Sequence, residues 1–200
     1  MNLEAANIDY DKRGIKVDNR LRTNNHKIFA LGDVIGDLQF THVAGYHAGI
    51  VIQNALFRLP SKVSHKAVPW VTYTDPELAH VGVTEAEAKE QGLTHSVLNW
   101  SFKENDRAQA ERRTEGKIKI VLDKRTRILG ATIVGAHAGE LILPWVLAIN
   151  QGLKIKAMAS VIAPYPTLSE VSKRAAGSYY TPKLFSDRTR WLVKFLSKFG

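Results

Sequence analysis

The residues best suited to chemistry lie in a short turn near the end of the chain. Tyr165 stands between Pro164 and Pro166, and each proline ring restricts the backbone around the tyrosine. Because little backbone freedom remains, we expect the phenolic hydroxyl to be held in one direction, where it can donate a hydrogen bond to a bound group. The alternative is a rigid loop in which the tyrosine ring only packs.

The same turn leads into a predicted helix at residues 167–179. Thr167 is followed three residues later by Glu170. This is the spacing of a capping box, in which a hydroxyl and a carboxylate each bind a free backbone N–H at the helix start. The sequence therefore places Glu170 directly behind Tyr165, with its carboxylate as a capping group.

A second candidate site follows a short apolar run. Gly32 ends this run and Asp33 comes next. Glycine lets a ligand approach the backbone, and a carboxylate accepts hydrogen bonds from sugar or polyol hydroxyls. A helix predicted to start near Thr41 would offer free N–H groups and a positive dipole end to a ring oxygen or an anion. The same pattern equally fits a strand-end turn in which Asp33 is only a cap.

Two strands and a helix are predicted to position this second site. Residues 14–18 alternate between apolar and polar, and residues 28–31 are all apolar, which is typical of a buried strand in an α/β sheet. Thr41 can cap a helix over residues 42–57. We expect the polar, basic segment at residues 58–66 to separate two domains.

The remainder of the chain predicts a sheet followed by helices. Strand patterns occur at residues 70–74, 78–83, 94–102, 117–122 and 127–134. Helical patterns occur at residues 84–91, 103–112, 139–151, 155–160 and 167–179. Because the strands mostly precede the helices, the predicted fold class is α+β, an antiparallel sheet with helices on one face.

The composition limits the function classes. The chain has no cysteine, so disulfides, thiolate zinc sites and thiol chemistry are excluded within these residues. Its seven histidines show neither a His-x-x-x-His spacing nor a carboxylate-rich cluster, so no metal site is predicted. No apolar run is long enough for a membrane span.

The net charge is +9, from 28 basic and 19 acidic residues. Part of the excess lies at residues 183–200 and the rest is scattered among acids, so we expect no nucleic-acid binding. Large apolar side chains recur there at helical spacing, opposite basic ones: Trp191, Leu192, Phe195, Leu196 and Phe199 against Arg190, Lys194 and Lys198. Residues 186–200 thus predict a basic amphipathic helix for a membrane surface. The alternative is a helix docked on another domain or subunit.

Four motifs in this order resemble the carboxy-terminal part of the flavin-dependent pyridine nucleotide–disulfide oxidoreductases. That family includes dihydrolipoamide dehydrogenase, glutathione reductase and mercuric reductase. The motifs are Phe29-Ala30-Leu31-Gly32-Asp33-Val34, Thr41-His42-Val43-Ala44, residues 69–82 and Tyr165-Pro166-Thr167-Leu168-Ser169-Glu170.

The resemblance implies three parts. Residues 1–60 would be the end of an α/β FAD-binding domain, residues 67–182 a dimerisation domain, and residues 183–200 the basic tail. The dimerisation domain would form a two-fold homodimer. Its tip would carry Tyr165 and Glu170 into the active site of the partner.

The resemblance also implies where the flavin would lie. Asp33, beside Gly32, would hold the ribityl chain of FAD. The helix start formed by Thr41, His42 and Val43 would face the pyrimidine edge of the flavin.

Two features depart from the family. First, the chain has no glycine-rich dinucleotide loop and no redox-active cysteine pair, so electrons cannot pass from NAD(P)H through flavin to a disulfide in these residues alone. We expect a fragment of a longer enzyme that uses FAD and NAD(P)H. We also expect residues 1–60 to be partly disordered or rearranged, because a strand from a parallel sheet would lose its neighbours.

Second, lipoamide dehydrogenases and glutathione reductases carry histidine where this chain has Tyr165, whereas mercuric reductases carry tyrosine. The ordinary pKa of tyrosine is about 10, so at neutral pH Tyr165 is a donor rather than a base. The resemblance thus favours a mercuric-reductase-like enzyme. The vicinal cysteine pair that ends mercuric reductases is absent from residues 197–200.

Two hypotheses follow. The first is an oxidoreductase that passes electrons to a small molecule, a disulfide or a metal ion. The second is a non-catalytic dimerisation module with a basic tail that binds lipid or nucleic acid. We expect a cytoplasmic protein, peripheral at the inner face of the membrane if the tail binds lipid.

Overall fold

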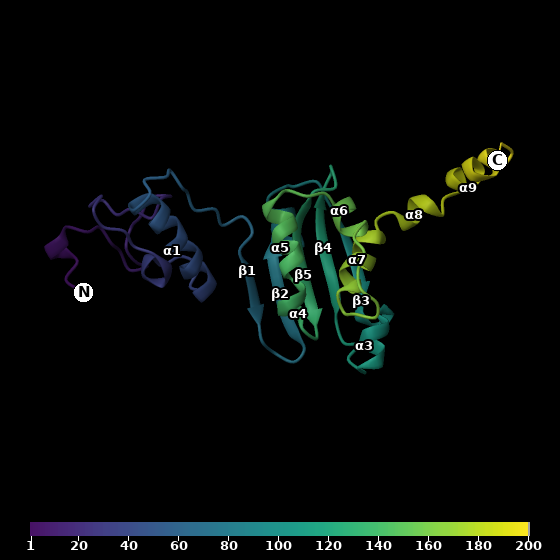
Figure 1. Cartoon of the computed structure of the whole chain (residues 1–200), viewed down its shortest axis with the longest axis horizontal. Helices are drawn as coiled ribbons and strands as arrows, with labels where there is room; N and C mark the ends of the chain where they lie inside the picture. The colour runs from purple at the N-terminus through teal and green to yellow at the C-terminus, as the bar shows by residue number, and fades with distance from the viewer. Residues whose placement is uncertain (200) are drawn as a thin grey trace. The chain divides into compact units, whose positions relative to one another are not determined.

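Residues 1–199 are described by a computed structural model, in which the chain forms two compact units. The first unit is Met1–His65 and the second begins at Lys66. Each unit has its own hydrophobic core. The colour in Figure 1 changes from purple and blue in the first unit to teal, green and yellow in the second.

The second unit is built on one five-stranded antiparallel sheet. Its strands are β1 (Pro69–Thr72), β2 (Glu77–Gly82), β3 (His95–Ser101), β4 (Lys117–Asp123) and β5 (Ile128–Gly135). The order across the sheet is β1-β2-β5-β4-β3, so β5 lies at the centre although it comes last in the chain. Strand β4 alternates as predicted only over its first four residues. Ile118 and Ile120 are fully buried, whereas Lys117 is exposed and Lys119 half-buried, and the next two residues, Val121 and Leu122, are both buried.

Helices cover one face of this sheet (Figure 1). They are α4 (Ala138–Leu141), α5 (Leu143–Asn150), α6 (Ile155–Ala159) and α7 (Glu170–Gly177). Helices α4 and α5 contact β2 and β5, and α7 contacts β3 and β4. The predicted α+β class is therefore confirmed. Burial of each large apolar side chain in this layer contributes about 1.5–3 kcal/mol.

The second unit also contains short helical segments between its strands. They are α2 (Glu85–Glu90), the 3₁₀ turn η3 (Phe102–Glu104) and α3 (Asp106–Ala110). Helix α2 begins with the predicted capping box: Thr84 Oγ1 accepts from the N–H of Glu87, and the Glu87 carboxylate accepts from the N–H of Thr84.

Several predicted helices are shorter than expected. The pattern at residues 103–112 forms a helix only over α3, after the turn η3. The pattern at residues 139–151 is divided into α4 and α5 at Ile142. Pro144 causes this division, because proline lacks an N–H and is tolerated only in the first turn of a helix, where it stands in α5. The last predicted helix, residues 167–179, forms only over α7.

The first unit contains less regular structure than predicted. It holds the 3₁₀ turns η1 (Glu4–Ala6) and η2 (Gly32–Ile35) and the helix α1 (Thr41–Ala55). The predicted strands at residues 14–18 and 28–31 are wrong: only isolated bridges form, between Tyr10 and Ile15 and between Arg22 and Phe29. A strand requires a neighbour along its length, and the described residues offer each segment a single pairing.

The tail forms two helices, α8 (Thr181–Leu184) and α9 (Asp187–Leu196). Ser186 caps α9, because its Oγ accepts from the N–H of Thr189 at 3.3 Å. Within residues 1–199, no helix has both the length and the apolar content to cross a membrane.

Candidate functional site

Tyr165 projects from its turn and meets a residue of α3. The residue is 68% exposed, and its hydroxyl donates a hydrogen bond to Oδ2 of Asp106 at 2.9 Å. The buried side chain of Asn105 explains why these two segments meet. Its Oδ1 caps α3 by accepting from the N–H of Ala108, and its Nδ2 donates to the carbonyl of Thr167 at 3.1 Å.

The Asp106 carboxylate controls the protonation of the phenol. The hydrogen bond to Asp106 is the largest cause, and the charges of Asp106 and Glu170 add to it, so the pKa of Tyr165 is raised above its ordinary value. A carboxylate acceptor stabilises the neutral phenol. At neutral pH Tyr165 is therefore protonated, which makes it a hydrogen-bond donor and not a base.

The predicted capping box at Thr167 and Glu170 is wrong. The Thr167 hydroxyl donates instead to the carbonyl of Pro164 at 2.7 Å and contacts Oγ of Ser169 at 2.7 Å. Helix α7 begins at Glu170 itself, with Ser169 as an N-cap that makes no side-chain capping bond. Because the Thr167 hydroxyl bonds to the Pro164 carbonyl within the turn, it does not cap the helix that follows.

Glu170 lies behind the turn but is not bonded to Tyr165. Its side chain is 12% exposed, and its Oε1 lies 4.0 Å from Nη2 of Arg174, one turn later in α7. The acidic partner of the phenol is thus Asp106, which the sequence did not indicate. No local signal could have found it, because the contact joins residues 59 positions apart.

The structure brings Gly32 and Asp33 next to α1, as the sequence predicted. Gly32 has a φ of +69°, and a Cβ at this position would lie 3.0 Å from Cβ of Ala44 in α1. Glycine is therefore required both for the backbone conformation and for the close approach of the turn to the helix. The Asp33 side chain beside it is exposed.

The start of α1 differs in detail from the expectation. Phe40, not Thr41, is the N-cap residue, and no side chain caps the helix. Thr41 and His42 are exposed, and the His42 ring stacks on Phe40 with a centroid distance of 5.1 Å. Val43 is 1% exposed, and its N–H donates to the Phe40 carbonyl at 3.0 Å. Val43 therefore packs into the core.

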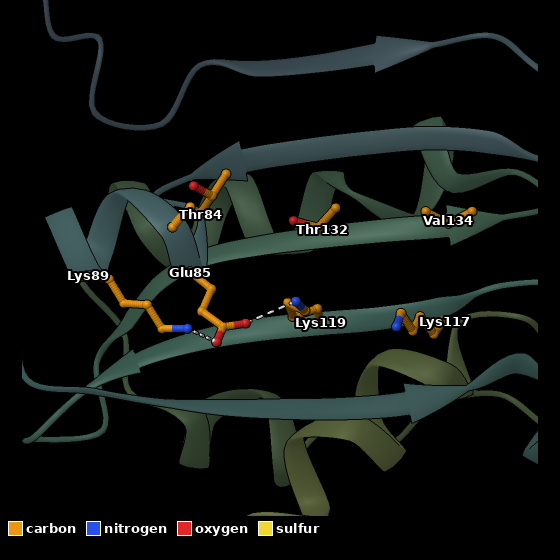
Figure 2. Close-up of a pocket in the computed structure, with 8 residues that line it drawn as sticks. Thr84, Glu85, Lys89, Lys117, Lys119, Thr132 and Val134 are labelled. Atoms are coloured by element: carbon orange, nitrogen blue, oxygen red, sulfur yellow. Dashed lines mark hydrogen bonds and ion pairs between the residues drawn. The ribbon is translucent and has the colours of Figure 1, made fainter.

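The face of the sheet opposite α4 and α5 holds a shallow hollow beneath α2, lined by both charged and apolar groups (Figure 2). Glu85 lies between two lysines there, 2.8 Å from Nζ of Lys89 and 3.0 Å from Nζ of Lys119. These hydrogen bonds lower the pKa of Glu85 to about 2, with Lys89 the larger cause. Glu85 is thus held by Lys89 and Lys119, and we assign this hollow no chemistry.

No cluster of three or more potential metal ligands occurs within residues 1–199. Among these described residues, the candidate chemistry is confined to two places: the Tyr165 turn with Asp106 in the second unit, and the Gly32–Asp33 turn with the start of α1 in the first.

Comparison with known protein families matches both units. Residues 68–176 match the family described as "Pyridine nucleotide-disulphide oxidoreductase, dimerisation domain". Residues 1–48 match the family described as "Pyridine nucleotide-disulphide oxidoreductase".

Individual relatives agree with these matches. A mercuric reductase of Bacillus cereus is 38% identical over 177 residues, covering 88% of this chain and 28% of that protein. A dihydrolipoyl dehydrogenase of Vibrio cholerae is 37% identical over 172 residues, covering 85% of this chain and 36% of that protein. The chain thus spans about a third of the length of these relatives.

Among solved structures, the HOCl-induced flavoprotein disulfide reductase RclA from Escherichia coli superposes with a TM-score of 0.81 at 30% identity. The match covers 88% of this chain and 41% of that one.

Proposed function

We propose, from the premise that this chain belongs to the pyridine nucleotide-disulphide oxidoreductase family, that it functions within an FAD- and NAD(P)H-dependent homodimeric reductase. In this proposal residues 67–182 form the dimer interface, residues 1–60 complete the flavin site, and residues 183–200 are a basic tail. The observation that carries the proposal is the dimerisation-domain match over residues 68–176, which includes the exposed Tyr165 turn.

The residues of the first unit fit a flavin. The Asp33 carboxylate is exposed beside a glycine with positive φ, so it can accept hydrogen bonds from ribityl hydroxyls. The first turn of the 15-residue helix α1 lies next to it and carries the positive end of the helix dipole, which suits the carbonyl oxygens of the pyrimidine ring. When bound, FAD would supply the redox chemistry. Gly32, Asp33, Thr41 and His42 would hold and orient it, with Val43 as the packing residue below.

Tyr165 and Glu170 are proposed to act in the partner's site. The exposed phenol is held in one direction by Asp106 and kept protonated by it. Its single O–H is donated to Asp106, so donation to a group bound in the other subunit would require exchange of that hydrogen bond, whereas the phenol oxygen can accept a hydrogen bond without any exchange. Glu170 would support it through its negative charge, and the restricted Pro164-Tyr165-Pro166 backbone would reduce the entropy lost on binding.

For the electron acceptor we propose only a class of compound: a small molecule, a disulfide or a metal ion. Tyrosine at position 165 favours a mercuric-reductase-like site over a lipoamide-dehydrogenase-like one. The rival hypothesis of a non-catalytic dimerisation module is not favoured, because residues 1–48 match the redox family as well.

Two measurements test the proposal. The protein isolated at its native length should show the absorbance bands of an oxidised flavin, and these should bleach on titration with NADPH or NADH. A preparation without flavin, or with flavin that neither nucleotide reduces, would leave the dimerisation module as the better account.

The second measurement addresses the position of Tyr165 on the 200-residue chain. Sedimentation should show a dimer, and nitration of Tyr165 should decrease as the chain concentration rises through the dimer dissociation constant. Tyr10 of the first unit, 48% exposed, is the control whose nitration should not change. If both tyrosines were protected from nitration to the same extent, or if the chain stayed monomeric at every concentration, the proposal that Tyr165 acts in the partner's site would be wrong.

A second proposal concerns location. We propose a cytoplasmic protein whose α9 binds the inner face of the membrane. The supporting observation is that the large apolar side chains of α9 are exposed, with the Trp191 ring stacked on Phe195 and Phe195 in edge contact with Phe199 just beyond the helix. Arg188, Arg190 and Lys194 of the same helix supply positive charge for an anionic surface.

A further inference from the structure

The first unit contains a buried histidine that the proposed function does not use. His47 lies on α1 and is 0% exposed. Its Nδ1 accepts a hydrogen bond from the N–H of Gly32 at 3.3 Å. Its Nε2 lies 3.2 Å from Nε2 of His65, and Nδ1 of His65 lies 3.2 Å from Oδ2 of Asp37. These contacts form one continuous chain from a backbone N–H to a carboxylate, which we call the histidine relay.

The direction of each hydrogen bond in the relay is determined. A neutral imidazole has one N–H donor and one acceptor nitrogen. The N–H of Gly32 can only donate, so Nδ1 of His47 is an acceptor and the ring proton lies on Nε2. That proton is donated to Nε2 of His65, whose own proton must then lie on Nδ1 and is donated to Asp37. The two rings are therefore opposite tautomers.

The relay is complete only when both rings are neutral. A second proton on His47 would place an N–H on Nδ1, facing the N–H of Gly32. A second proton on His65 would place an N–H on Nε2, facing that of His47. Burial lowers the pKa of His47, the charge on His65 lowers it further, and the Asp37 carboxylate opposes both. The neutral form of His47 is thus favoured at neutral pH.

The relay is not a metal site. To bind a metal ion through Nε2, His47 would need its proton on Nδ1, against the N–H of Gly32. The part of the chain that the structure describes also supplies no third ligand there. We therefore assign the contact between Nε2 of His47 and Nε2 of His65 to a hydrogen bond.

The relay connects three segments that are separate in the sequence. Gly32 begins η2, His47 lies on α1, and His65 ends the unit. The last segment is held to α1 a second time, because the N–H of Ser64 donates to the hydroxyl of Tyr46 at 2.9 Å. Gly32 directly precedes Asp33. A hydrogen bond that holds the backbone at Gly32 therefore also restricts the position of the Asp33 backbone, from which the carboxylate side chain extends.

We infer that His47 is a positioning residue for the flavin-facing turn. The His65–Asp37 pair sets the tautomer of His47, His47 holds the Gly32 peptide, and the Gly32 peptide places Asp33 against the start of α1. The identity of the ligand as a flavin rests on the proposed function, whereas the relay rests on the contacts alone.

The first test reads the tautomers directly. The 200-residue chain is labelled with ¹⁵N in its histidine rings and studied by NMR without flavin. The expected result is an Nε2–H tautomer for His47 and an Nδ1–H tautomer for His65. The same tautomer in both rings, or rapid exchange between tautomers in either, would overturn the relay.

The second test uses a matched pair of variants. His65→Gln keeps an acceptor oxygen near the position of Nε2, whereas His65→Leu removes the acceptor. Amide exchange at Gly32 should accelerate roughly 5- to 10-fold in His65→Leu, and His65→Gln should restore most of the protection. His26→Leu, at an exposed histidine of the same unit, is the control and should leave exchange at Gly32 unchanged. Unchanged exchange in His65→Leu would overturn the role assigned to His47.

The third test separates the relay from the proposed function. In the flavin-loaded protein at its native length, His65→Leu should weaken FAD retention roughly 5- to 10-fold, and His65→Gln should weaken it less. If the tautomers are as stated but His65→Leu retains FAD normally, the positioning role is wrong while the proposed function stands. If no variant or parent protein holds FAD, the proposed function fails while the relay stands.

Discussion

The carboxylate of Asp106 accepts a hydrogen bond from the phenol of Tyr165 at 2.9 Å, across 59 positions of the chain. Asn105 makes this contact possible, because its side chain caps α3 and also holds the carbonyl of Thr167. The direction and protonation of the Tyr165 hydroxyl are therefore set by α3. This helix of five residues lies earlier in the chain, before strands β4 and β5.

Replacing Asp106 should change the titration of Tyr165. In Asp106→Asn the acceptor loses its charge, so the pKa of Tyr165 should fall from its raised value toward the ordinary one. The pKa is measured from the ¹³Cζ shift, assigned with Tyr165→Phe. Glu104→Gln, at an exposed acid in the preceding turn, is the control and should leave the titration as it is. An unchanged pKa in Asp106→Asn would show that the hydrogen bond does not persist in solution.

Glu85 should contribute a pH-dependent part of the stability. Its pKa is lowered from 4.5 to about 2 by Lys89 and Lys119. A lowered carboxylate pKa means that the contribution is present above pH 4.5 and is lost as the pH falls from 4.5 to about 2. In Glu85→Gln this part of the pH dependence of the unfolding free energy should be missing.

Denaturant unfolding at several pH values measures this contribution. Glu90→Gln is the matched control, because Glu90 is an exposed carboxylate on the same helix. If Glu85→Gln and Glu90→Gln change the pH profile equally, the two lysines do not hold the Glu85 carboxylate.

The buried indole of Trp145 should depend on Ser172. Its Nε1–H donates to Oγ of Ser172 at 3.0 Å, and both side chains are buried between α5 and α7. Ser172→Ala leaves a buried donor without an acceptor, which should destabilise the second unit by about 1–3 kcal/mol. Chemical denaturation measures the change in unfolding free energy.

The control is Ser178→Ala, because the Ser178 hydroxyl bonds only to a carbonyl of the preceding helical turn, that of Ala175. We expect a change within about 0.5 kcal/mol for this variant. A loss in Ser172→Ala no larger than that in Ser178→Ala would mean that the indole finds another acceptor.

Helix α9 should bind anionic lipid. Vesicles that contain phosphatidylserine should sediment the chain, whereas phosphatidylcholine vesicles should not, because each basic residue near the surface contributes about 1 kcal/mol. Deletion of residues 186–200 should abolish the binding, and Lys194→Glu should weaken it. Binding that survives the deletion would show that α9 is not the lipid-binding segment, and equal binding to both vesicles would show that its basic residues do not select anionic lipid.

Much of the second unit could be predicted from the sequence. The alternation at residues 117–120 predicts which face of β4 is buried, and Thr84 with Glu87 predicts where α2 begins. These features depend on neighbouring residues, whose spacing reports directly on the periodicity of a strand or on the free N–H groups of a helix start. A turn at Gly32–Asp33 was also predicted from local sequence, although the strand expected before it does not form.

Only the tertiary structure decided which side chains meet. Thr167 has the spacing of a cap, but its hydroxyl bonds to Pro164, and the acid that reaches Tyr165 comes from α3. The histidine relay joins residues 32, 37, 47 and 65, of which the sequence analysis assigned a role only to Gly32. Such contacts depend on the path of the backbone between distant positions, and a hydrogen bond has no periodicity that would appear in the sequence.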